Sequence, residues 1–327
     1  MSNYINIRES ITNYLESVKL SRSWNTFITY RNAMNNFIET LKNNNIEIND
    51  QPPSAIKENA IAWFAKDLKN RAATTEQLYL TAVKGFYDYL VAENIVNYNL
   101  PKIKLLIKQR SRRQGKRLPQ FHSREITKLL EYYNKKNISA IKDKRAILRA
   151  LRDKAILVTL ADTGLRVHEA CNLRRGDIDW NEGKALIIGK GNKQAIIRFS
   201  RRSQRALKTY LKARAKIDGN SGRPLTSLPL FARHDKGAGK KIKPISTTTG
   251  RNIVADRVKE ALGEEAAGTI TPHSFRHYFV TKVLITTGNL KLAQRLARHQ
   301  NIAVTQRYAH LSDSELDKGY WQVFEED

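Results

Sequence analysis

The stretch DIDWNEGKALIIGKGNKQAIIRFS, residues 177–200, decides the fold class of this chain. Apolar and polar residues alternate along it, β-branched residues recur, and Gly191–Asn192 suits the two-residue turn of a β-hairpin. Before it, residues 141–163 have the apolar spacing of a long helix, and a strongly basic helix follows from Arg201. The sequence therefore predicts a small antiparallel sheet inside a domain that is otherwise mostly helical.

The residues on the N-terminal side predict a separate, all-helical part. Apolar side chains at Phe27, Met34, Phe37 and Leu41 follow helical spacing, and the neighbouring segments repeat this pattern. Four such helices make a small bundle, and further helices follow the sheet to the end of the chain. We expect a mainly α protein in three parts: a helical domain over 1–105, a basic linker over 106–118 and a mixed α+β domain over 119–327.

The charge of the chain is strongly positive and unevenly distributed. Its 327 residues include 58 Lys and Arg against 31 Asp and Glu, which gives a formal net charge of +27. Residues 1–105 hold 12 basic and 10 acidic side chains, so the other 222 residues hold 46 and 21, a net of +25. Polyanions are natural partners of such a surface, because neutralised phosphates release bound counterions. With 41% hydrophobic residues the chain can also bury cores, which excludes a disordered basic tail.

Cysteine use and hydropathy indicate the compartment. Cys171 is the only cysteine, so no disulfide can form within the chain and we expect a reducing environment. No signal peptide is recognisable, and no apolar run is long enough to span a bilayer. We expect a cytoplasmic, nucleoid-associated protein that does not act on membranes.

A run of basic residues joins the two folded parts. The segment KIKLLIKQRSRRQGKR, residues 102–117, has eight cations and no acid. An isolated run of this kind is usually a solvated linker, but beside two folded parts it equally suits a strap along a phosphate backbone. We expect DNA contacts from this segment and from the basic helix after the sheet: Lys102, Lys104, Lys108, Arg110, Arg112, Arg113, Lys116, Arg117, Arg201, Arg202, Arg205, Lys208 and Lys212.

The motif PHSFRH, residues 272–277, offers two histidines four residues apart on one helical face, a spacing that zinc proteases use. The glutamate of that zinc motif is missing, Arg276 lies between the histidines, and no third ligand has suitable spacing. A metal site is therefore rejected. His273 and Arg276 lie on a different face from Phe275, which belongs to a core stripe, so they can approach one ligand together.

Other residues of the second part suit attack on a phosphodiester. Arg166 follows a helix-ending glycine, and Glu169 lies one turn on, where it can orient the arginine. Two guanidiniums can hold both non-bridging phosphate oxygens and offset charge in the transition state. Tyrosine has a pKa of about 10, so it needs cations or a base such as histidine to become a nucleophile. Lys190 is either the proton donor to the leaving oxygen or an ordinary exposed turn lysine.

Four motifs then carry a family resemblance. TGLRVHEACNL (163–173), IIGKGNKQAIIRF (187–199), PHSFRH (272–277) and RHQNIAVTQRYAH (298–310) occur in the order seen in tyrosine recombinases, the family of phage integrases, Xer and Cre-like proteins. The resemblance covers essentially the whole chain. It implies a helical, SAM-like core-binding domain followed by a catalytic domain, and DNA strand exchange through a 3′-phosphotyrosyl bond without metal, ATP or another cofactor.

The resemblance also assigns roles. It implies that Arg166 and Arg276 clamp the phosphate and that Glu169 supports Arg166. His273 would assist proton transfer at the nucleophile, and His299 occupies the position filled by His or Trp. Two further residues have implied chemical roles, the hairpin lysine that protonates the 5′-oxygen and the nucleophile: Lys190 and Tyr308.

The chain also departs from the family pattern. The family usually has Leu-Gly-His where this chain has Ala297-Arg298-His299, so Arg298 adds bulk and charge beside the site. Lys193 is a rival for the role of Lys190. Among the 13 tyrosines only motif position selects Tyr308; Tyr278 is expected on a different helix face from His273.

The resemblance further implies partners. The tail over 312–327 combines acids with an apolar stripe, and in the family such a segment often packs on the neighbouring subunit. We expect double-stranded DNA with a specific, inverted-repeat site, a homodimer on one site and a homotetramer in synapsis. The alternatives are strand nicking and resealing like a type IB topoisomerase, a DNA-binding protein that has lost catalysis, and a purely architectural binder.

Overall fold

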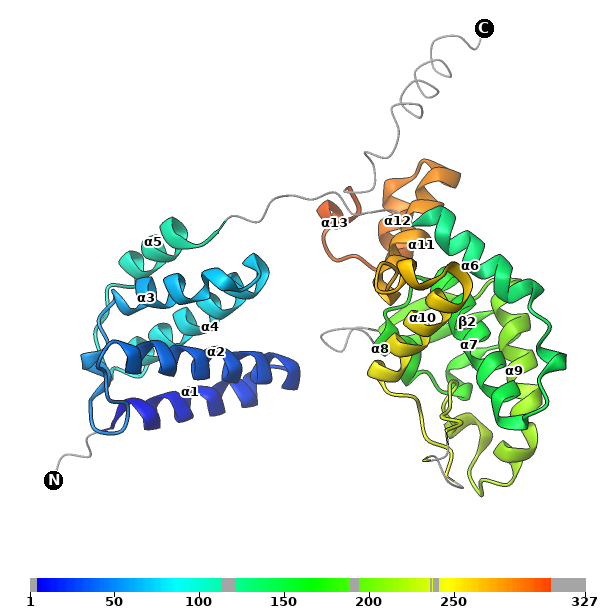
Figure 1. Cartoon of the computed structure of the whole chain (residues 1–327), viewed down its shortest axis with the longest axis horizontal. Helices are drawn as coiled ribbons and strands as arrows, with labels where there is room; N and C mark the ends of the chain where they lie inside the picture. The colour runs from blue at the N-terminus through cyan, green and yellow to red at the C-terminus, as the bar shows by residue number, and fades with distance from the viewer. Residues whose placement is uncertain (1–4, 113–121, 189–193, 236, 238–240, 307–327) are drawn as a thin grey trace, which may run out of the picture. The chain divides into compact units, whose positions relative to one another are not determined.

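A computed structural model describes residues 5–112, 122–188, 194–235, 237 and 241–306 of the chain. Contacts within the chain divide it into two compact units, Met1–Arg117 and Leu118–Asp327, coloured blue to cyan and green to orange in Figure 1. None of the described helices has both the length and the apolar character needed to cross a membrane.

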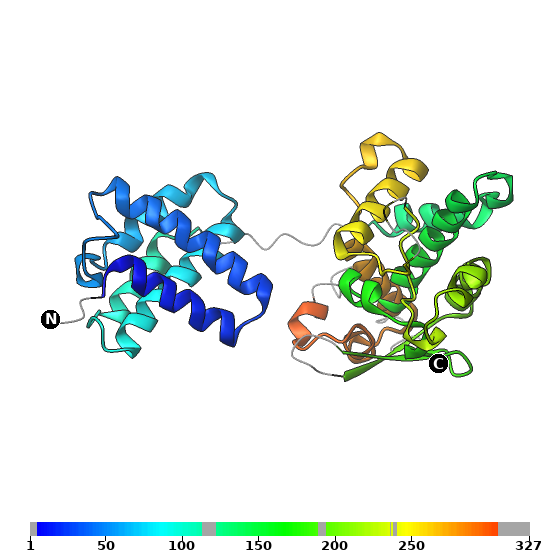
Figure 2. The same cartoon turned by 90° about the horizontal axis from the view of Figure 1, so that it is seen from below.

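The first unit is a bundle of helices, as the apolar spacing predicts. Helices α1 and α2 lie side by side (Figures 1 and 2), and α2 also packs on α3 and α4. Phe37 and Phe64 meet edge to face at 5.3 Å between ring centroids in the core. The bounds of its helices are α1 Ile7–Ser21, α2 Trp24–Asn43, α3 Ala60–Asp67, α4 Ala73–Ala92 and α5 Leu100–Arg110.

Helix α5 corrects the expected start of the linker at residue 106. Asn99 caps the helix by accepting from the Lys102 amide, and Ile103 is fully buried against the bundle. Beyond the helix, Arg112 is anchored to the first unit because its amide and its Nε both donate to the buried Glu76 carboxylate. Residues 106–112 therefore belong to the first unit.

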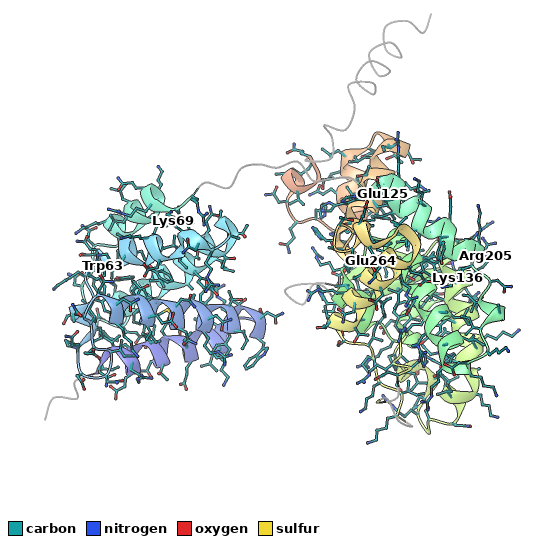
Figure 3. All side chains as sticks on the ribbon, in the orientation of Figure 1. Trp63, Lys69, Glu125, Lys136, Arg205 and Glu264 are labelled. Carbon is teal, nitrogen blue, oxygen red and sulfur yellow. The ribbon has the colours of Figure 1, made fainter. Side chains whose placement is uncertain are left out.

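The same carboxylate binds Lys69, labelled in Figure 3, through a 2.9 Å ion pair. Lys69 also donates to the Arg110 carbonyl, and a buried acid thus holds the end of α5 in place from two sides. Propensity could not reveal this end point, because Glu76 lies 36 residues before Arg112 in the sequence.

The second unit surrounds α7, which packs against α9 and α11 and also contacts α6, α8 and α10. The predicted helix over 141–163 begins at Lys144, where Asp143 accepts from the amides of the first turn. The bounds of the elements are α6 Ser123–Lys135, α7 Lys144–Thr163, α8 Val167–Asn172, β1 Ile178–Asp179, β2 Lys184–Ile188, β3 Gln194–Arg198, α9 Arg201–Gly219, α10 Thr247–Leu262, α11 Pro272–Thr287, α12 Leu290–Ala297 and α13 Ile302–Gln306.

The sheet has the order β1-β2-β3, and both pairs of strands are antiparallel. Ala185 pairs with Ile197, and both side chains are buried in the core of the unit together with Ile187. The neighbouring pair, Leu186 and Ile196, projects from the other face and is exposed. The predicted mainly α fold with a small antiparallel sheet is confirmed, and the expected turn at 191–192 lies outside the described residues.

Gly164 connects the core to the candidate site. It ends α7 with φ +59°, and a Cβ at this position would lie 2.5 Å from the ring of Phe279 on α11. Glycine is required on both grounds, because other residues rarely adopt this backbone conformation and because α11 approaches closely. This close approach brings the end of α7 against α11, the helix that begins with the PHSFRH motif.

Candidate active site

Arg166 and Glu169 form the first part of the site. Arg166 is the N-cap of α8, and its amide donates to Glu169 Oε2 at 2.8 Å in a capping arrangement. Its guanidinium donates from Nη1 to Glu169 Oε1 at 2.9 Å. Since the Glu169 side chain is buried while 40% of the Arg166 side chain is exposed, the acid holds the arginine from behind. The three-residue spacing of Arg166 and Glu169 thus corresponds to an ion pair between them.

Arg276 is brought to the same place by α11. Thr271 caps this helix and Pro272 is its first residue. At that position the missing amide hydrogen of proline costs no hydrogen bond of the helix. Arg276 is only 2% exposed, and its Nη1 donates to the Gly164 carbonyl at 2.6 Å. Its Nη2 donates to the carbonyl of Ala297 at the end of α12. Two carbonyls from helix ends therefore fix this guanidinium.

The histidines of the motif both have pKa values below the usual value for histidine. Desolvation and the positive charges of Arg276 and Arg166 lower the pKa of His273 below its usual value. His273 lies in the first turn of α11, where the helix dipole also disfavours a cation. His277 packs its ring at 4.5 Å from that of His273, and burial with the neighbouring charge lowers its pKa to about 4. Both rings are therefore neutral near pH 7.

His299 joins the arginines from the segment after α12. Its Nδ1 and the Oγ1 of Thr305 on α13 lie 2.8 Å apart in a hydrogen bond, and Thr305 is fully buried. Desolvation, followed by the charges of Arg276 and Arg166, lowers the pKa of His299 to about 4. His299 is thus a neutral ring fixed by a threonine that sequence reasoning did not select.

Arg298 also belongs to this cluster, and the sequence did not reveal its role. Its Nη2 donates to Glu169 Oε2 at 2.9 Å and makes a longer contact of 3.5 Å with the Gly164 carbonyl. Only 12% of its side chain is exposed. Its departure from the family pattern could have drawn attention to it, but its partners could not be read from spacing.

A cavity of about 430 Å³ opens beside these groups. Arg166, His273 and Arg276 line it, as does Arg251 from α10, which the sequence reasoning also missed. The cavity therefore has three guanidiniums and a neutral imidazole on its walls. Such walls suit an anion with several oxygen acceptors, and a phosphodiester is one.

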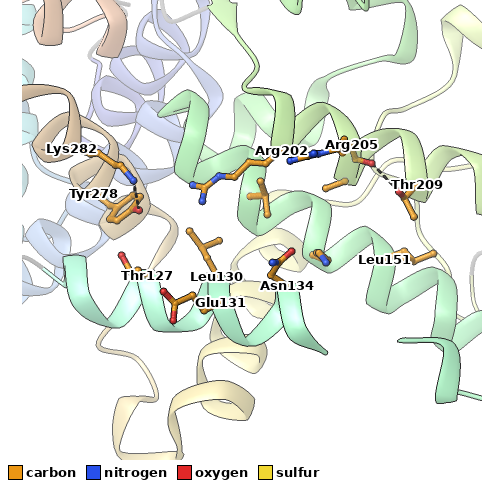
Figure 4. A pocket seen from close by; sticks show the side chains of 13 residues that line it. Thr127, Leu130, Glu131, Asn134, Leu151, Arg202, Arg205, Thr209, Tyr278 and Lys282 are labelled. Carbon is orange, nitrogen blue, oxygen red and sulfur yellow. Dashed lines mark hydrogen bonds between the residues drawn. The ribbon is translucent and has the colours of Figure 1, made fainter. Parts of the chain in front are cut away.

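Two cations predicted to contact DNA lie elsewhere. Arg202 and Arg205 line a different cavity together with Tyr278 and Lys282, and Figure 4 shows these four side chains around it. Arg202 is paired with Asp162, and its ion pair joins the start of α9 to the end of α7. Tyr278 does not line the cavity of His273, as its helix position predicts.

The remaining predicted residues divide into two groups. Lys102 pairs with Glu58 at 3.5 Å, and these predicted contacts are exposed: Lys104, Lys108, Arg110, Arg201, Lys208 and Lys212. The others lie outside the described residues: Lys190, its rival Lys193, Tyr308, Arg113, Lys116, Arg117 and the tail over 312–327. Within the described part of the chain, no three His, Cys, Asp or Glu side chains are placed to hold a metal ion.

Comparison with known proteins assigns this arrangement to a family. The phage integrase family model matches residues 120–315, and the phage integrase N-terminal SAM-like domain matches residues 11–94. The chain belongs to the phage integrase family of tyrosine recombinases. The resemblance inferred from the four motifs is confirmed, and the chain is a site-specific tyrosine recombinase.

Relatives extend over most of this recombinase. Tyrosine recombinase XerC of Thermodesulfovibrio yellowstonii is 29% identical over 315 residues, which cover 95% of this chain and 94% of that protein. Tyrosine recombinase XerC of Pediococcus pentosaceus is 30% identical over 257 residues, 78% of this chain and 77% of that protein.

Solved structures share the fold. The XerH site-specific recombinase bound to palindromic difH substrate, a post-cleavage complex, has a TM-score of 0.68 and 21% identity, with 90% of this chain and 79% of that chain covered. The Tn1549 transposon integrase in complex with transposon right end DNA has a TM-score of 0.65 and 17% identity, with 96% and 99% covered.

Proposed function

We propose that this recombinase cuts and rejoins double-stranded DNA through a covalent 3′-phosphotyrosyl bond at Tyr308. The observation that carries the proposal is that Arg166, Arg276 and His273 line one cavity. His299 lies close enough to it for the charges of both arginines to lower its pKa. Tyr308 follows α13 by two residues, and Thr305 of that helix is bonded to His299.

The arginines supply the electrostatic part of the reaction. They remain protonated at any working pH and can donate to both non-bridging oxygens as negative charge builds on phosphorus. Two fixed guanidiniums in a partly dry site provide positive charge of the kind that a divalent ion provides in other phosphoryl-transfer enzymes. We therefore propose that neither a metal ion nor ATP takes part.

The histidines and a lysine move the protons. A neutral imidazole can accept the phenol proton when the tyrosine oxygen bonds to phosphorus and the bond to the 5′-oxygen breaks. His273 is in the protonation state that this step requires. We assign protonation of the leaving 5′-oxygen to Lys190, and religation runs the same transfers in reverse with a 5′-hydroxyl of the partner duplex.

Trapping of the covalent intermediate tests the function. A duplex that carries the recombination site and a nick beside the cleavage point loses its short leaving strand, so the protein–DNA bond accumulates. Wild type should give an adduct that resists denaturation and persists in EDTA, and Tyr308→Phe should give none. Tyr278→Phe is the matched control and should still react. An adduct with Tyr308→Phe would place the nucleophile elsewhere.

Exchange of partners separates recombination from simple nicking and resealing. A recombinase joins strands of two site-bearing duplexes, whereas an enzyme like a type IB topoisomerase relaxes supercoils as a monomer. The XerH complex contains a palindromic substrate, which supports an inverted-repeat site with one homodimer per site. We propose that two such dimers form a tetramer in synapsis. Recombinant junctions between two labelled duplexes are the expected product.

We also infer that the tail over 312–327 docks on a second copy of the chain. A groove of about 550 Å³ is lined by apolar residues of α11 and α12 and by the charged side chains of Arg202, Lys282 and Asp162. The tail carries the complementary pattern of apolar and acidic residues. Deletion of 312–327 should weaken synapsis and leave binding to a single site intact, measured by native gel shift. Unaltered synapsis would contradict this inference.

A further inference from the structure

Arg298 occupies a backbone position that does not favour arginine. It ends α12 with φ +58°, in the left-handed region. The two other non-glycine residues with positive φ in the described part of the chain are asparagines, Asn45 and Asn94, which tolerate this region better. A glycine would fit position 298 with less strain, so the arginine side chain itself is the feature to explain.

The contacts of Arg298 reach an acceptor of each clamp arginine. Glu169, to which Arg298 donates, also accepts from Arg166. The Gly164 carbonyl, which Arg298 Nη2 approaches at 3.5 Å, accepts from Arg276. Three guanidiniums therefore converge on one carboxylate and one carbonyl, and Arg298 is the member that touches both.

The position of Arg298 favours an indirect role over contact with DNA. Its Nη1 is buried and has no hydrogen-bond partner among the described residues, and its Nη2 is held by Glu169. Arg166, by contrast, is 40% exposed and lines the cavity. The guanidinium of Arg298 thus lies behind the groups that face the ligand.

Charge gives the arrangement a function. Arg166, Arg276 and Arg298 contribute three positive charges and Glu169 one negative charge, so this cluster has a net charge of +2. Arg251 adds a further positive charge on the cavity wall. Attack on a phosphodiester monoanion by a phenolate passes through a dianionic transition state, which this surplus of positive charge stabilises. Glycine at position 298 would lower the net charge of the cluster to +1, because Glu169 would then neutralise one of its two remaining arginines.

We propose that Arg298 is a positioning residue for strand cleavage. It shares the Glu169 carboxylate with Arg166, which keeps the Arg166 guanidinium in place and leaves more of its positive charge to act on the phosphate. This inference rests on the proposed function and names a residue that acts through Glu169 and Arg166 on that same reaction. It accounts for the arginine in place of glycine.

The ionisation of Glu169 supplies an independent signature. Burial raises the pKa of Glu169, but Arg298 first, and then Arg166, lower it below its usual value. The other charges around it are Arg276 from α11 and, across the cavity, Arg251 from α10. Without Arg298 the pKa of Glu169 rises. On acidification, a variant without Arg298 should therefore lose its cleavage activity at a higher pH than wild type does.

The test is single-turnover cleavage of the nicked duplex at saturating protein, followed as a function of pH. Arg298→Gly relieves the backbone and removes the guanidinium, and we expect cleavage about 10- to 100-fold slower, the size of effect that loss of orientation causes. The DNA dissociation constant should be unchanged, and the acidic limb of the pH profile should move to higher pH. Arg298→Lys should recover part of the rate.

Two further variants complete the design. Arg295→Ala removes an exposed arginine from the same helix and should leave both rate and pH profile unchanged. The double variant Glu169→Gln, Arg298→Gly should cleave only slightly more slowly than Glu169→Gln alone, because both changes break the same contact between Arg298 and Glu169.

The outcomes are distinct. Cleavage by Arg298→Gly at the wild-type rate with an unmoved pH profile would overturn the positioning role while the Tyr308-dependent adduct of wild type still stands. Additive losses with Glu169→Gln would overturn it too, as would a common fall in thermal stability for Arg298→Gly and Arg298→Lys that accounts for the slower rates. Absence of the adduct in wild type would overturn the proposed function, and this inference with it.

Discussion

The second unit contains two clusters of arginines that differ in how fully their donors are hydrogen-bonded. Arg214 on α9 is completely buried, and its Nε donates to Asp218 at 3.0 Å. Its Nη1 donates to the Tyr210 hydroxyl and the Leu230 carbonyl, and its Nη2 to the Pro229 carbonyl at 2.8 Å. Every nitrogen of this guanidinium has a partner within the protein.

The cluster at Gly164 and Glu169 is bonded less completely. Arg166 pairs only with Glu169 among the described residues and keeps 40% of its side chain exposed, and Arg298 Nη1 is buried without a described partner. A satisfied buried arginine stabilises the fold, whereas cations that exceed their acceptors beside a cavity favour an anionic ligand. The difference in bonding, rather than the residue type, separates the structural cluster from the candidate catalytic one.

The largest expected effect comes from the satisfied cluster. Arg214→Ala removes one of the two ion pairs of the buried Asp218 carboxylate. The free energy of unfolding should therefore fall by roughly 3–5 kcal/mol. Urea denaturation measures the change, with exposed Lys216→Ala on the same helix as control. Cleavage per folded molecule should stay at the wild-type level. A loss below about 1 kcal/mol, the scale of an exposed pair, would break the comparison.

The next effect comes from the candidate catalytic cluster. Arg276→Ala removes a fixed donor to the phosphate, so single-turnover cleavage at saturating DNA should slow by about 10²–10³-fold, or roughly 2.7–4 kcal/mol. Some stability is lost as well, because the Gly164 and Ala297 carbonyls lose their donor. The rate is therefore measured well below the melting temperature. Lys282→Ala on the same helix is the control, and a rate within tenfold of wild type for Arg276→Ala would count against the assignment.

The smallest effect sharpens the comparison through pH. The Tyr210 hydroxyl accepts from the Ala232 amide and from Arg214, so its own proton points to His234 Nε2 at 2.8 Å, which must then be unprotonated. Burial and the charges of Arg152 and Arg214 accordingly lower the pKa of His234 to about 3.

Because the folded pKa of His234 is depressed, its stabilising contribution is complete above the unfolded value near 6.5 and is lost as pH falls. Between pH 7 and pH 5 this histidine alone should remove about 2 kcal/mol, at roughly 1.4 kcal/mol for each pH unit below 6.5. Urea denaturation at several pH values should show a shallower dependence for His234→Asn than for wild type. Equal slopes would show that His234 does not titrate as inferred.

The fold and the family were predicted correctly from local sequence patterns. Alternation placed the strands around Ala185 and Ile197, and the three-residue spacing of Arg166 and Glu169 predicted their pairing. Helical periodicity also separated His273 and Arg276 from the face of Tyr278. Each of these inferences depends on neighbours within a turn or a hairpin, where backbone geometry fixes which side chains meet.

Longer-range contacts were missed. Nothing in the spacing reveals that Glu76 anchors Arg112, that Thr305 bonds the His299 ring, or that Arg251 lines the cavity. The linker was therefore expected to begin at residue 106, although the buried Glu76 carboxylate binds the chain as far as residue 112. Such partners meet only after whole helices have packed.

The sequence by itself determined that this is a helical tyrosine recombinase with two arginines and two histidines in fixed motifs, because helical periods and short motifs are local properties. Only the tertiary structure decided how those arginines are held. Gly164 lets α7 meet α11 without a side chain between them, and the end of α12 places Arg298 on Glu169. Which guanidinium is satisfied and which is left to face a ligand depends on acceptors contributed by segments over a hundred residues apart, such as Gly164 and Arg276, and packing alone brings these together.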